Sequence, residues 1–304
     1  MVGGPAEGAP GRRRPNGDTR GGRLAAILRA MPTRSAPDGP LLYAHRGTPR
    51  LFPENSMPGL AHAIALGADV LEIDAHMTAD GHVVVVHDAD GTRMAGVDRA
   101  IRESPLSLVQ AWDVATGFDG EVAGPVRVAT LDAVLRELPR ARLNIDVKQT
   151  VPDMVLPLLE LLHRHRAASR VLLTSFEHRT LRRIRRAGYG GQTGLSQREA
   201  IVAAFAPRRV AALRSPRAER LQIPTHYMGV DLGTRRFIDR FHRQALRVDY
   251  WVVNDTDHAR RLLDLGADGI VTDVPDVMGR VFATHARTGG WRARHPERAA
   301  ELSG

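Results

Sequence analysis

The chain lacks cysteine, and this absence excludes several kinds of chemistry. With no Cys among 304 residues, disulfides, thiolate nucleophiles and Cys-ligated zinc or iron–sulfur sites are ruled out. No apolar run approaches the ~18 residues that a membrane-spanning helix needs. The apolar patch at 24–28 is stopped by Arg29 and is too short for a signal peptide. Together these absences favour a cytoplasmic protein.

Lysine is almost absent as well. Of the 43 lysine and arginine residues, 42 are arginine and the single lysine is Lys148, in the segment NIDVK. A lysine ammonium is a compact, rotatable point charge, whereas an arginine guanidinium is a planar fork, so the two are not equivalent at a crowded site. The position of this one lysine, beside Asp146, indicates a functional reason for keeping it.

The net charge of +9 lies mainly in the ends of the chain. Residues 1–40 carry seven arginines against three acids, and residues 279–304 carry five arginines against two acids. We interpret these stretches as solvated basic segments: a disordered N-terminal segment at 1–37 and a C-terminal tail at 288–304, around one domain at 38–287. No nucleic-acid partner is expected, and membrane contact is expected to be peripheral at most. The sequence leaves the oligomeric state open.

Strands and helices alternate over about 245 residues, which predicts an α/β protein with a (β/α)8 TIM barrel. The first predicted helix follows Ser56, and the others lie near 131–138, 154–166, 179–186, 198–206, 237–246, 258–265 and 276–285. The candidate strands are 41–44, 70–75, 83–86, 143–147, 171–174, 193–195, 221–223, 249–253 and 269–271. A doubly wound open sheet is the alternative, but no GxGxxG loop follows the first strand.

Nine candidate strands compete for eight places, and the weakest are 193–195 and 221–223. The stretch 71–88 has no room for a helix between its two halves. Residues 75–82 therefore either return as an extended segment or form a hairpin that turns at Asp80-Gly81. The sequence leaves both paths open.

Polar residues stand repeatedly just past a strand, where barrel enzymes carry their sites. Glu72 and Asp74 share one face of a strand, and such neighbours repel unless a cation or a proton separates them. With Asp146 they predict a site for a hard divalent cation, Mg²⁺ or Ca²⁺. Two histidines could serve as general acid and base, and two cationic side chains could hold an anion. The set suits a phosphate ester, and its members are His45, Arg46, Glu54, Glu72, Asp74, His87, Asp146 and Lys148.

These residues occur in motifs that resemble the glycerophosphodiester phosphodiesterase family over residues 41 to about 280. The motifs are His45-Arg46-Gly47, Pro53-Glu54-Asn55-Ser56, Glu72-Ile73-Asp74, His87-Asp88, Asn144 to Lys148, Trp251 to Asn254, and Gly266 to Asp273. The resemblance implies a phospholipase-C-like barrel. It also implies hydrolysis of glycerophosphodiesters to an alcohol and sn-glycerol 3-phosphate with a divalent cation.

The resemblance also implies a role for each matching residue. His45 and His87 would be the acid–base pair, and Glu72, Asp74 and Asp146 would be metal ligands. Arg46 and Lys148 would contact phosphate, and Glu54, Asn55, Trp251 and Asn254 would complete the substrate site. The chain departs from the family where Asp146 replaces the usual Glu, which shortens that ligand by one methylene.

Several alternatives stay open at this stage. One histidine could deprotonate the glycerol 2-hydroxyl of the substrate, which would then attack phosphorus and form a cyclic phosphate that water opens; water could also attack directly. A lysophospholipase D would act on lipids with one acyl chain, which residues in 105–118 and 205–228 could line, although ordinary packing explains them equally. A non-catalytic binding protein on the same barrel is the third alternative.

Overall fold

The computed structural model describes residues 39–205 and 218–287. The basic segments predicted at 1–37 and 288–304 lie outside the described residues. Within the described ranges, no helix is both long and apolar enough to cross a membrane.

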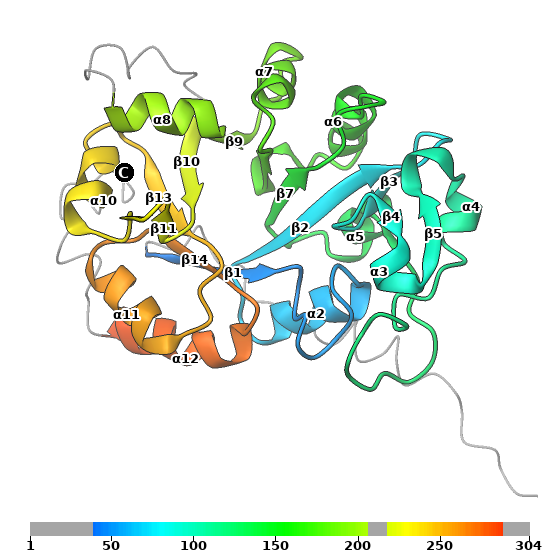
Figure 1. Ribbon diagram of the computed structural model, residues 1–304, viewed down its shortest axis with the longest axis horizontal. Helices are drawn as coiled ribbons and strands as arrows, with labels where there is room; N and C mark the ends of the chain where they lie inside the picture. Colours follow the sequence, from blue (N-terminus) through cyan, green and yellow to red (C-terminus); the bar gives the residue numbers. More distant parts are fainter. Residues whose placement is uncertain (1–38, 206–217, 288–304) are drawn as a thin grey trace, which may run out of the picture. The chain divides into compact units, whose positions relative to one another are not determined.

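Eight parallel strands form a closed barrel, as the alternation in the sequence predicts (Figure 1). Hydrogen bonds link neighbours around the ring, and β1 closes it by pairing with β2, where His45 lies opposite Glu72. In ring order the strands are β1 Leu41–His45, β2 Val70–Met77, β7 Leu143–Val147, β8 Val171–Thr174, β9 Gln192–Gly194, β10 Ala218–Ile223, β13 Arg247–Tyr250 and β14 Gly269–Thr272.

A helix follows each barrel strand along the chain. Polar caps set several of the starts: Ser56 Oγ accepts from the backbone N–H of Gly59 before α2, and Asp255 accepts from His258 N–H at 2.7 Å before α11. These caps fix where each chain segment turns back from the carboxyl end of its strand. The helices are α2 Met57–Ala65, α5 Leu131–Glu137, α6 Val155–Arg164, α7 His178–Arg186, α8 Gln197–Phe205, α10 Arg235–His242, α11 Thr256–Asp264 and α12 Pro275–Arg287.

The surplus candidate strand, predicted at 83–86, lies outside the ring. Residues 78–82 turn, and β3 Val83–Val85 runs back antiparallel to β2, with Met77 opposite Val83. Gly81 adopts a φ of 85°, a left-handed conformation that suits glycine in a tight turn. Of the two paths left open by the sequence, the hairpin is therefore the correct one. The two strands that the sequence marks weakest, β9 and β10, both belong to the barrel.

The segment after β3 forms an insertion with its own apolar cluster. It contains β4 Asp90–Gly91, α3 Thr92–Ala95, β5 Val97–Ala100, a 3₁₀ turn at Ile101–Glu103, α4 Leu106–Val109 and β6 Ala129–Thr130. Trp112 packs in this cluster with Val86 and Ile101 and is only 4% exposed. Trp112 therefore belongs to ordinary packing and does not line an acyl groove.

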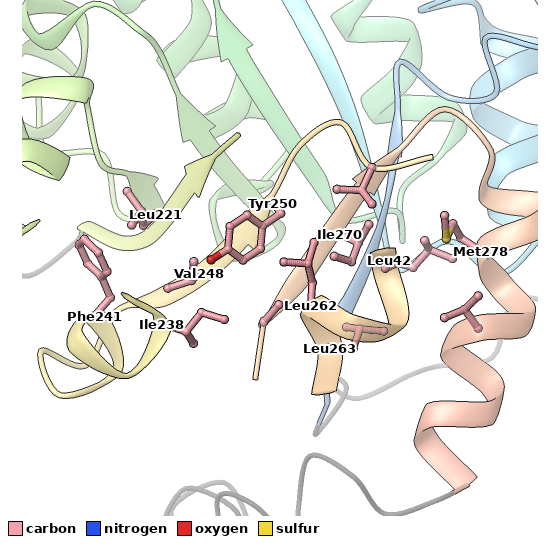
Figure 2. Packing of buried hydrophobic residues seen from close by; sticks show 14 of the residues in the cluster. Leu42, Leu221, Ile238, Phe241, Val248, Tyr250, Leu262, Leu263, Ile270 and Met278 are labelled. Atoms are coloured by element: carbon pink, nitrogen blue, oxygen red, sulfur yellow. The ribbon is translucent and has the colours of Figure 1, made fainter. Parts of the chain in front are cut away.

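The main apolar core joins the last third of the chain to the first strand (Figure 2). Ile238 and Phe241 of α10, Leu262 of α11 and Met278 of α12 pack against strand residues that include Ile270. Burial of these large side chains, each worth about 1.5–3 kcal/mol relative to exposure, seats the three helices on β10, β13, β14 and β1.

A buried ion pair joins the neighbouring barrel strands β10 and β13. Arg220 Nη1 donates to Asp249 Oδ1 at 2.6 Å, and both side chains are almost completely buried. Tyr43 Oη and Gln222 Nε2 donate to the other carboxylate oxygen, Asp249 Oδ2, at 3.1 and 3.3 Å. Because each charge satisfies the other, losing either one leaves an uncompensated charge in the core.

We predict that Asp249→Ala lowers the free energy of unfolding by about 3–5 kcal/mol, since it leaves the Arg220 guanidinium buried without its partner. The double variant Asp249→Leu with Arg220→Met leaves no buried charge and is expected to lose less. Urea unfolding followed by circular dichroism measures both. Asp257→Ala, which breaks an exposed pair with Arg260, is the control and should change stability by under about 1 kcal/mol. Equal losses for the double variant and Asp249→Ala would contradict the prediction.

Candidate active site

The residues singled out in the sequence gather at the carboxyl ends of the barrel strands. His45 ends β1, Glu72 and Asp74 lie in β2, and Asp146 lies in β7 directly opposite Asp74. Lys148 follows β7. The loops at 46–56 and 251–255 follow the carboxyl ends of β1 and β13. Residues 87–88 follow β3, which runs back along β2 until the backbone N–H of Val86 donates to the carbonyl of Asp74.

The loop between β1 and α2 needs an unusual backbone to reach the cluster. Arg46 and Asn55 both have positive φ, at 51° and 57°, and Gly47 has a φ of 86°. A Cβ at Gly47 would lie 2.9 Å from the backbone carbon of Gly59, so only glycine allows α2 to approach this closely. The loop thereby directs the Asn55 amide to donate to Asp74 Oδ2 at 2.9 Å.

Three buried carboxylates share one small region with two cations. Lys148 Nζ lies 3.0 Å from Asp74 Oδ1 and 2.7 Å from Asp146 Oδ2, so one nitrogen bridges two acids. Arg46 Nε lies 3.3 Å from Asp74 Oδ2. Glu72 has a 3.3 Å hydrogen bond from the backbone N–H of Arg46. The cations partly neutralise a group of acids that burial alone would disfavour.

The electrostatics divide these carboxylates into two kinds. Burial, followed by repulsion from Asp74 and Asp146, raises the pKa of Glu72 well above its usual range. Burial also raises the pKa of Asp146, although Lys148 opposes the shift. Burial would raise the pKa of Asp74 too, but Lys148, Arg46 and the Asn55 amide outweigh it and hold that pKa low. Negative charge is therefore anchored on Asp74 and disfavoured on its two neighbours.

An aspartate orients His45. Its Nδ1 lies 2.6 Å from Asp273 Oδ1, and its Nε2 lies 3.9 Å from Glu72 Oε2. Asn254 Nδ2 donates to the other Asp273 oxygen at 2.7 Å, and Asn254 Oδ1 accepts from the backbone N–H of Asp273. A proton on Nδ1 would be held by Asp273, which would leave Nε2 facing the carboxylates and able to accept a proton.

A second aspartate orients His87, through a longer ionic chain. His87 Nδ1 lies 2.7 Å from Asp88 Oδ1, and Arg93 Nε donates to Asp88 Oδ2 at 2.6 Å. Arg93 also bonds Glu54 at 2.6 Å, and Glu54 accepts from Arg46 at 3.2 Å. The insertion is thus tied to the β1 loop through the same charges that set the orientation of His87.

Aromatic side chains flank the lysine. Lys148 Nζ lies 5.7 Å from the centre of the Phe176 ring, within range of a cation–π contact. The Phe176 and Trp251 rings meet edge to face with their centres 6.1 Å apart. Trp251, predicted as a substrate contact, therefore stands next to the cluster.

Sequence reasoning assigned no role to Asp273, Asp88 or Arg93. Asp273 directly follows β14 and was visible as a polar residue at a strand end, but nothing in the sequence pairs it with His45, which is 228 positions away. Arg93 gave no signal, because it is one of 42 arginines. Among the predicted substrate contacts, Asn55 bonds Asp74 in the structure and is only 3% exposed, so its contact with phosphate stays a prediction.

A cavity of about 390 Å³ lies between the β1–α2 loop and the insertion. Glu54 and Arg93 form part of its wall, together with Phe118 and Met94. It therefore borders the ionic chain of His87.

Buried acids, two cations and two aspartate-bonded histidines meet at the mouth of a (β/α)8 barrel, an arrangement that suits the class of phosphodiester hydrolases. The comparisons agree with this class. The sequence pattern of the glycerophosphoryl diester phosphodiesterase family matches residues 45–277. The "Probable glycerophosphodiester phosphodiesterase 2" of Mycobacterium tuberculosis is 30% identical over 266 residues, which cover 83% of this chain and 94% of that protein. The chain therefore belongs to the glycerophosphoryl diester phosphodiesterase family and is a phosphoric diester hydrolase.

Other relatives and solved structures are similar at greater distance. A glycerophosphodiester phosphodiesterase of Caldanaerobacter subterraneus is 26% identical, over 78% of this chain and 96% of that protein. A lysophospholipase D of Rattus norvegicus is also 26% identical, over 76% of this chain and 82% of that protein. A phosphodiesterase of Oleispira antarctica, solved with the product sn-glycerol-3-phosphate, shares the fold with a TM-score of 0.65 at 19% identity, over 81% and 97% of the two chains.

We predict that Asn55→Ala lowers the free energy of unfolding by about 1–3 kcal/mol, because it removes a buried hydrogen bond to Asp74. Alanine is also strained at a φ of 57°, so Asn55→Gly, which suits that φ, separates the lost amide from the strain. Arg93→Ala is the comparison: Arg93 is half exposed, and its ion pairs should contribute under about 1 kcal/mol. Urea unfolding in which Arg93→Ala loses as much as Asn55→Gly would contradict this ranking.

Proposed function

We propose that the protein hydrolyses glycerophosphodiesters to an alcohol and sn-glycerol 3-phosphate, with His45 and His87 as the acid–base pair and with a divalent cation. The observation that carries the proposal is the orientation of the two histidines. Each is held at Nδ1 by an aspartate. His45 lies 2.6 Å from Asp273 and 3.9 Å from Glu72, and His87 lies 2.7 Å from Asp88.

The donor set is chemically suited to a hard cation. Within the described residues, no three such side chains enclose a space for a metal ion as they stand, because Lys148 lies between Asp74 and Asp146. One oxygen, Asp146 Oδ1, is nevertheless buried without a hydrogen-bond partner in this part of the chain. We infer that Glu72, Asp74 and Asp146 would hold Mg²⁺ or Ca²⁺, which prefer carboxylate oxygens. When bound, the cation would stabilise negative charge on the phosphoryl oxygens.

The proposed reaction has two steps. In the first, one histidine takes the proton of the substrate's glycerol 2-hydroxyl at Nε2, and that oxygen bonds to phosphorus. The bond from phosphorus to the head-group oxygen breaks, and the other histidine protonates the departing alcohol. In the second, one histidine takes a proton from water, whose oxygen bonds to phosphorus. The bond from phosphorus to the glycerol 2-oxygen breaks, the other histidine protonates that oxygen, and glycerol 3-phosphate results.

Several residues support these steps without moving protons. Arg46 and Lys148 would bind the phosphoryl oxygens, so their present partners Glu54, Asp74 and Asp146 hold them in place until substrate arrives. Glu54 and Asn55 act as positioning residues for Arg46 and Asp74. Trp251 would pack against the glycerol moiety, and Asn254 would keep Asp273 on His45.

A lysophospholipase D reaction is the second candidate. It would place the same site on lipids with one acyl chain. The specific observation in its favour is the exposure of Tyr227 and Met228, at 46% and 86%, on a loop that starts at the carboxyl end of β10. A non-catalytic role would require the complete set of acids and histidines to be kept without use. The predicted cytoplasmic location stays a prediction.

We predict that His45→Ala lowers kcat/KM for glycerophosphocholine by about 10²–10⁴-fold, because general acid–base catalysis contributes about that much. The substrate is assayed beside lysophosphatidylcholine, and a preference for the lysophospholipid would select the second candidate. His163→Ala, an exposed histidine on α6, is the matched control and should retain activity. Unchanged turnover in folded His45→Ala would overturn the assignment of His45, and no turnover of any diester by the wild type would overturn the function.

We predict that Mg²⁺ or Ca²⁺ raises the melting temperature of chelator-treated protein, because a ligand that binds only the folded state adds about 2.7 kcal/mol at a hundredfold excess over Kd. Asp146→Asn should reduce this shift, since it removes one charged ligand. Asp257→Asn, at an exposed helix position, should leave the shift unchanged. A shift of the same size in Asp146→Asn and wild type would exclude Asp146 as a ligand.

A further inference from the structure

Large apolar side chains are exposed around the mouth of the barrel. Thirteen large hydrophobic residues are exposed in the described ranges, and six of them lie on loops that leave the carboxyl ends of β7, β8, β10 and β13. We call these six the apolar rim: Val151, Phe176, Tyr227, Met228, Val230 and Val252. Parallel strands place these loops at the end of the barrel that carries the active site, so the rim lies beside the site. Exposed apolar groups concentrated on one face mark an interaction surface.

The most exposed part of the rim is a small hairpin made of β11 His226–Tyr227 and β12 Val230–Asp231. Its two central residues, Met228 and Gly229, have φ values of 47° and 79°. Two-residue turns of this kind favour Asn-Gly or Asp-Gly, because most side chains resist positive φ. Met228 is 86% exposed, so neither turn chemistry nor packing explains a methionine here.

The hairpin is held firmly at its base. The backbone N–H of Leu232 donates to Thr225 at 2.8 Å, and Tyr250 Oη donates to the carbonyl of Leu232 at 2.7 Å. Gln197 Nε2 donates to Tyr227 Oη at 2.9 Å. These hydrogen bonds therefore hold the exposed tip of the hairpin in a fixed position.

Cations stand beside the rim in positions that their own helices disfavour. Arg179, Arg198 and Arg236 are exposed in the first turns of α7, α8 and α10. The helix dipole repels positive charge at an N-terminal turn, and α7 and α10 have no acid in their first turns to offset it. Exposed acids stand on the same loops, namely Glu177, Asp231 and Asp255. The helix dipole gives no reason for Arg179 and Arg236, whereas an external negative surface does.

We propose that the apolar rim docks on an anionic lipid surface, with the Met228 tip inserted and Arg179, Arg198 and Arg236 against the head groups. Apolar side chains beside cations are what binding at a lipid interface requires. A second copy of this chain fits less well, because a symmetric contact would bring the arginines of the two copies together. The proposal does not rest on the reaction proposed above, since docking is measured without turnover.

The test uses the full chain and sedimentation with vesicles of phosphatidylcholine, with and without phosphatidylglycerol. Wild type should bind the anionic vesicles. Met228→Ser with Val230→Ser should weaken this binding at least about tenfold, because two apolar side chains no longer leave water. Arg179→Gln with Arg198→Gln should weaken binding to anionic vesicles and reduce its dependence on salt. Leu108→Ser, an exposed leucine of the insertion, is the matched control and should bind as wild type.

Several outcomes would overturn the proposal. If the hairpin variant still binds the vesicles, binding depends on other parts of the chain, such as the arginine-rich segments at 1–40 and 279–304, which every variant retains. Absence of wild-type binding would exclude the lipid surface. If light scattering shows that the wild type is a dimer and the hairpin variant is a monomer, the apolar rim binds a second copy of this chain. Circular dichroism and the melting temperature confirm that each variant is folded, so loss of binding is not loss of structure.

Discussion

The structure depends on keeping three buried carboxylates together at the end of two adjacent strands. β2 and β7 pair in register so that Asp74 lies opposite Asp146, and Glu72 lies two residues away on the same face. Burial, followed by repulsion from Asp74 and Asp146, raises the pKa of Glu72, so the arrangement is unfavourable on its own. Nearby segments stabilise the carboxylates: the β1 loop brings Arg46 and Asn55 to Asp74, and the chain after β7 brings Lys148.

The barrel solves a second problem with the same geometry, which is to fix two imidazole rings. His45 ends β1 and Asp273 follows β14, and the pairing of these two strands sets the rings and carboxylates side by side. His87 follows the short β3, whose pairing with β2 returns the chain to the mouth. The hairpin that seemed one strand too many is thus the element that carries the second histidine to the site. Closure of the ring by β1 and β2 then places both histidines around the same acids.

The sequence predicted the barrel and the positions of most candidate site residues, because the ends of strands can be recognised from the local sequence. His45, Glu72, Asp74 and Asp146 follow or end apolar runs, and parallel strands must bring such ends together. It could not establish β9 and β10 as barrel strands, because β9 has only three residues and β10 carries the polar residues Glu219, Arg220 and Gln222. It also could not find the pairing of His45 with Asp273, which depends on strand order, or the role of Arg93, which depends on how the insertion folds back. Local sequence patterns thus predict the strands and helices, whereas the pairs of side chains that meet in the site depend on how the barrel closes.

The single lysine shows how the choice of cation follows from geometry. Where one buried acid must be matched, the chain uses arginine: Arg220 meets Asp249 inside the barrel. At the mouth, one nitrogen must reach Asp74 at 3.0 Å and Asp146 at 2.7 Å at once. A compact ammonium does this from one atom, whereas a guanidinium divides its donors over a rigid plane, as Arg93 does between Asp88 and Glu54. The ammonium also turns on a flexible stem, so it can leave one carboxylate without losing the other. Arginine at this position would neutralise the acids through a planar fork, which fixes the direction of each hydrogen bond more strictly than an ammonium does.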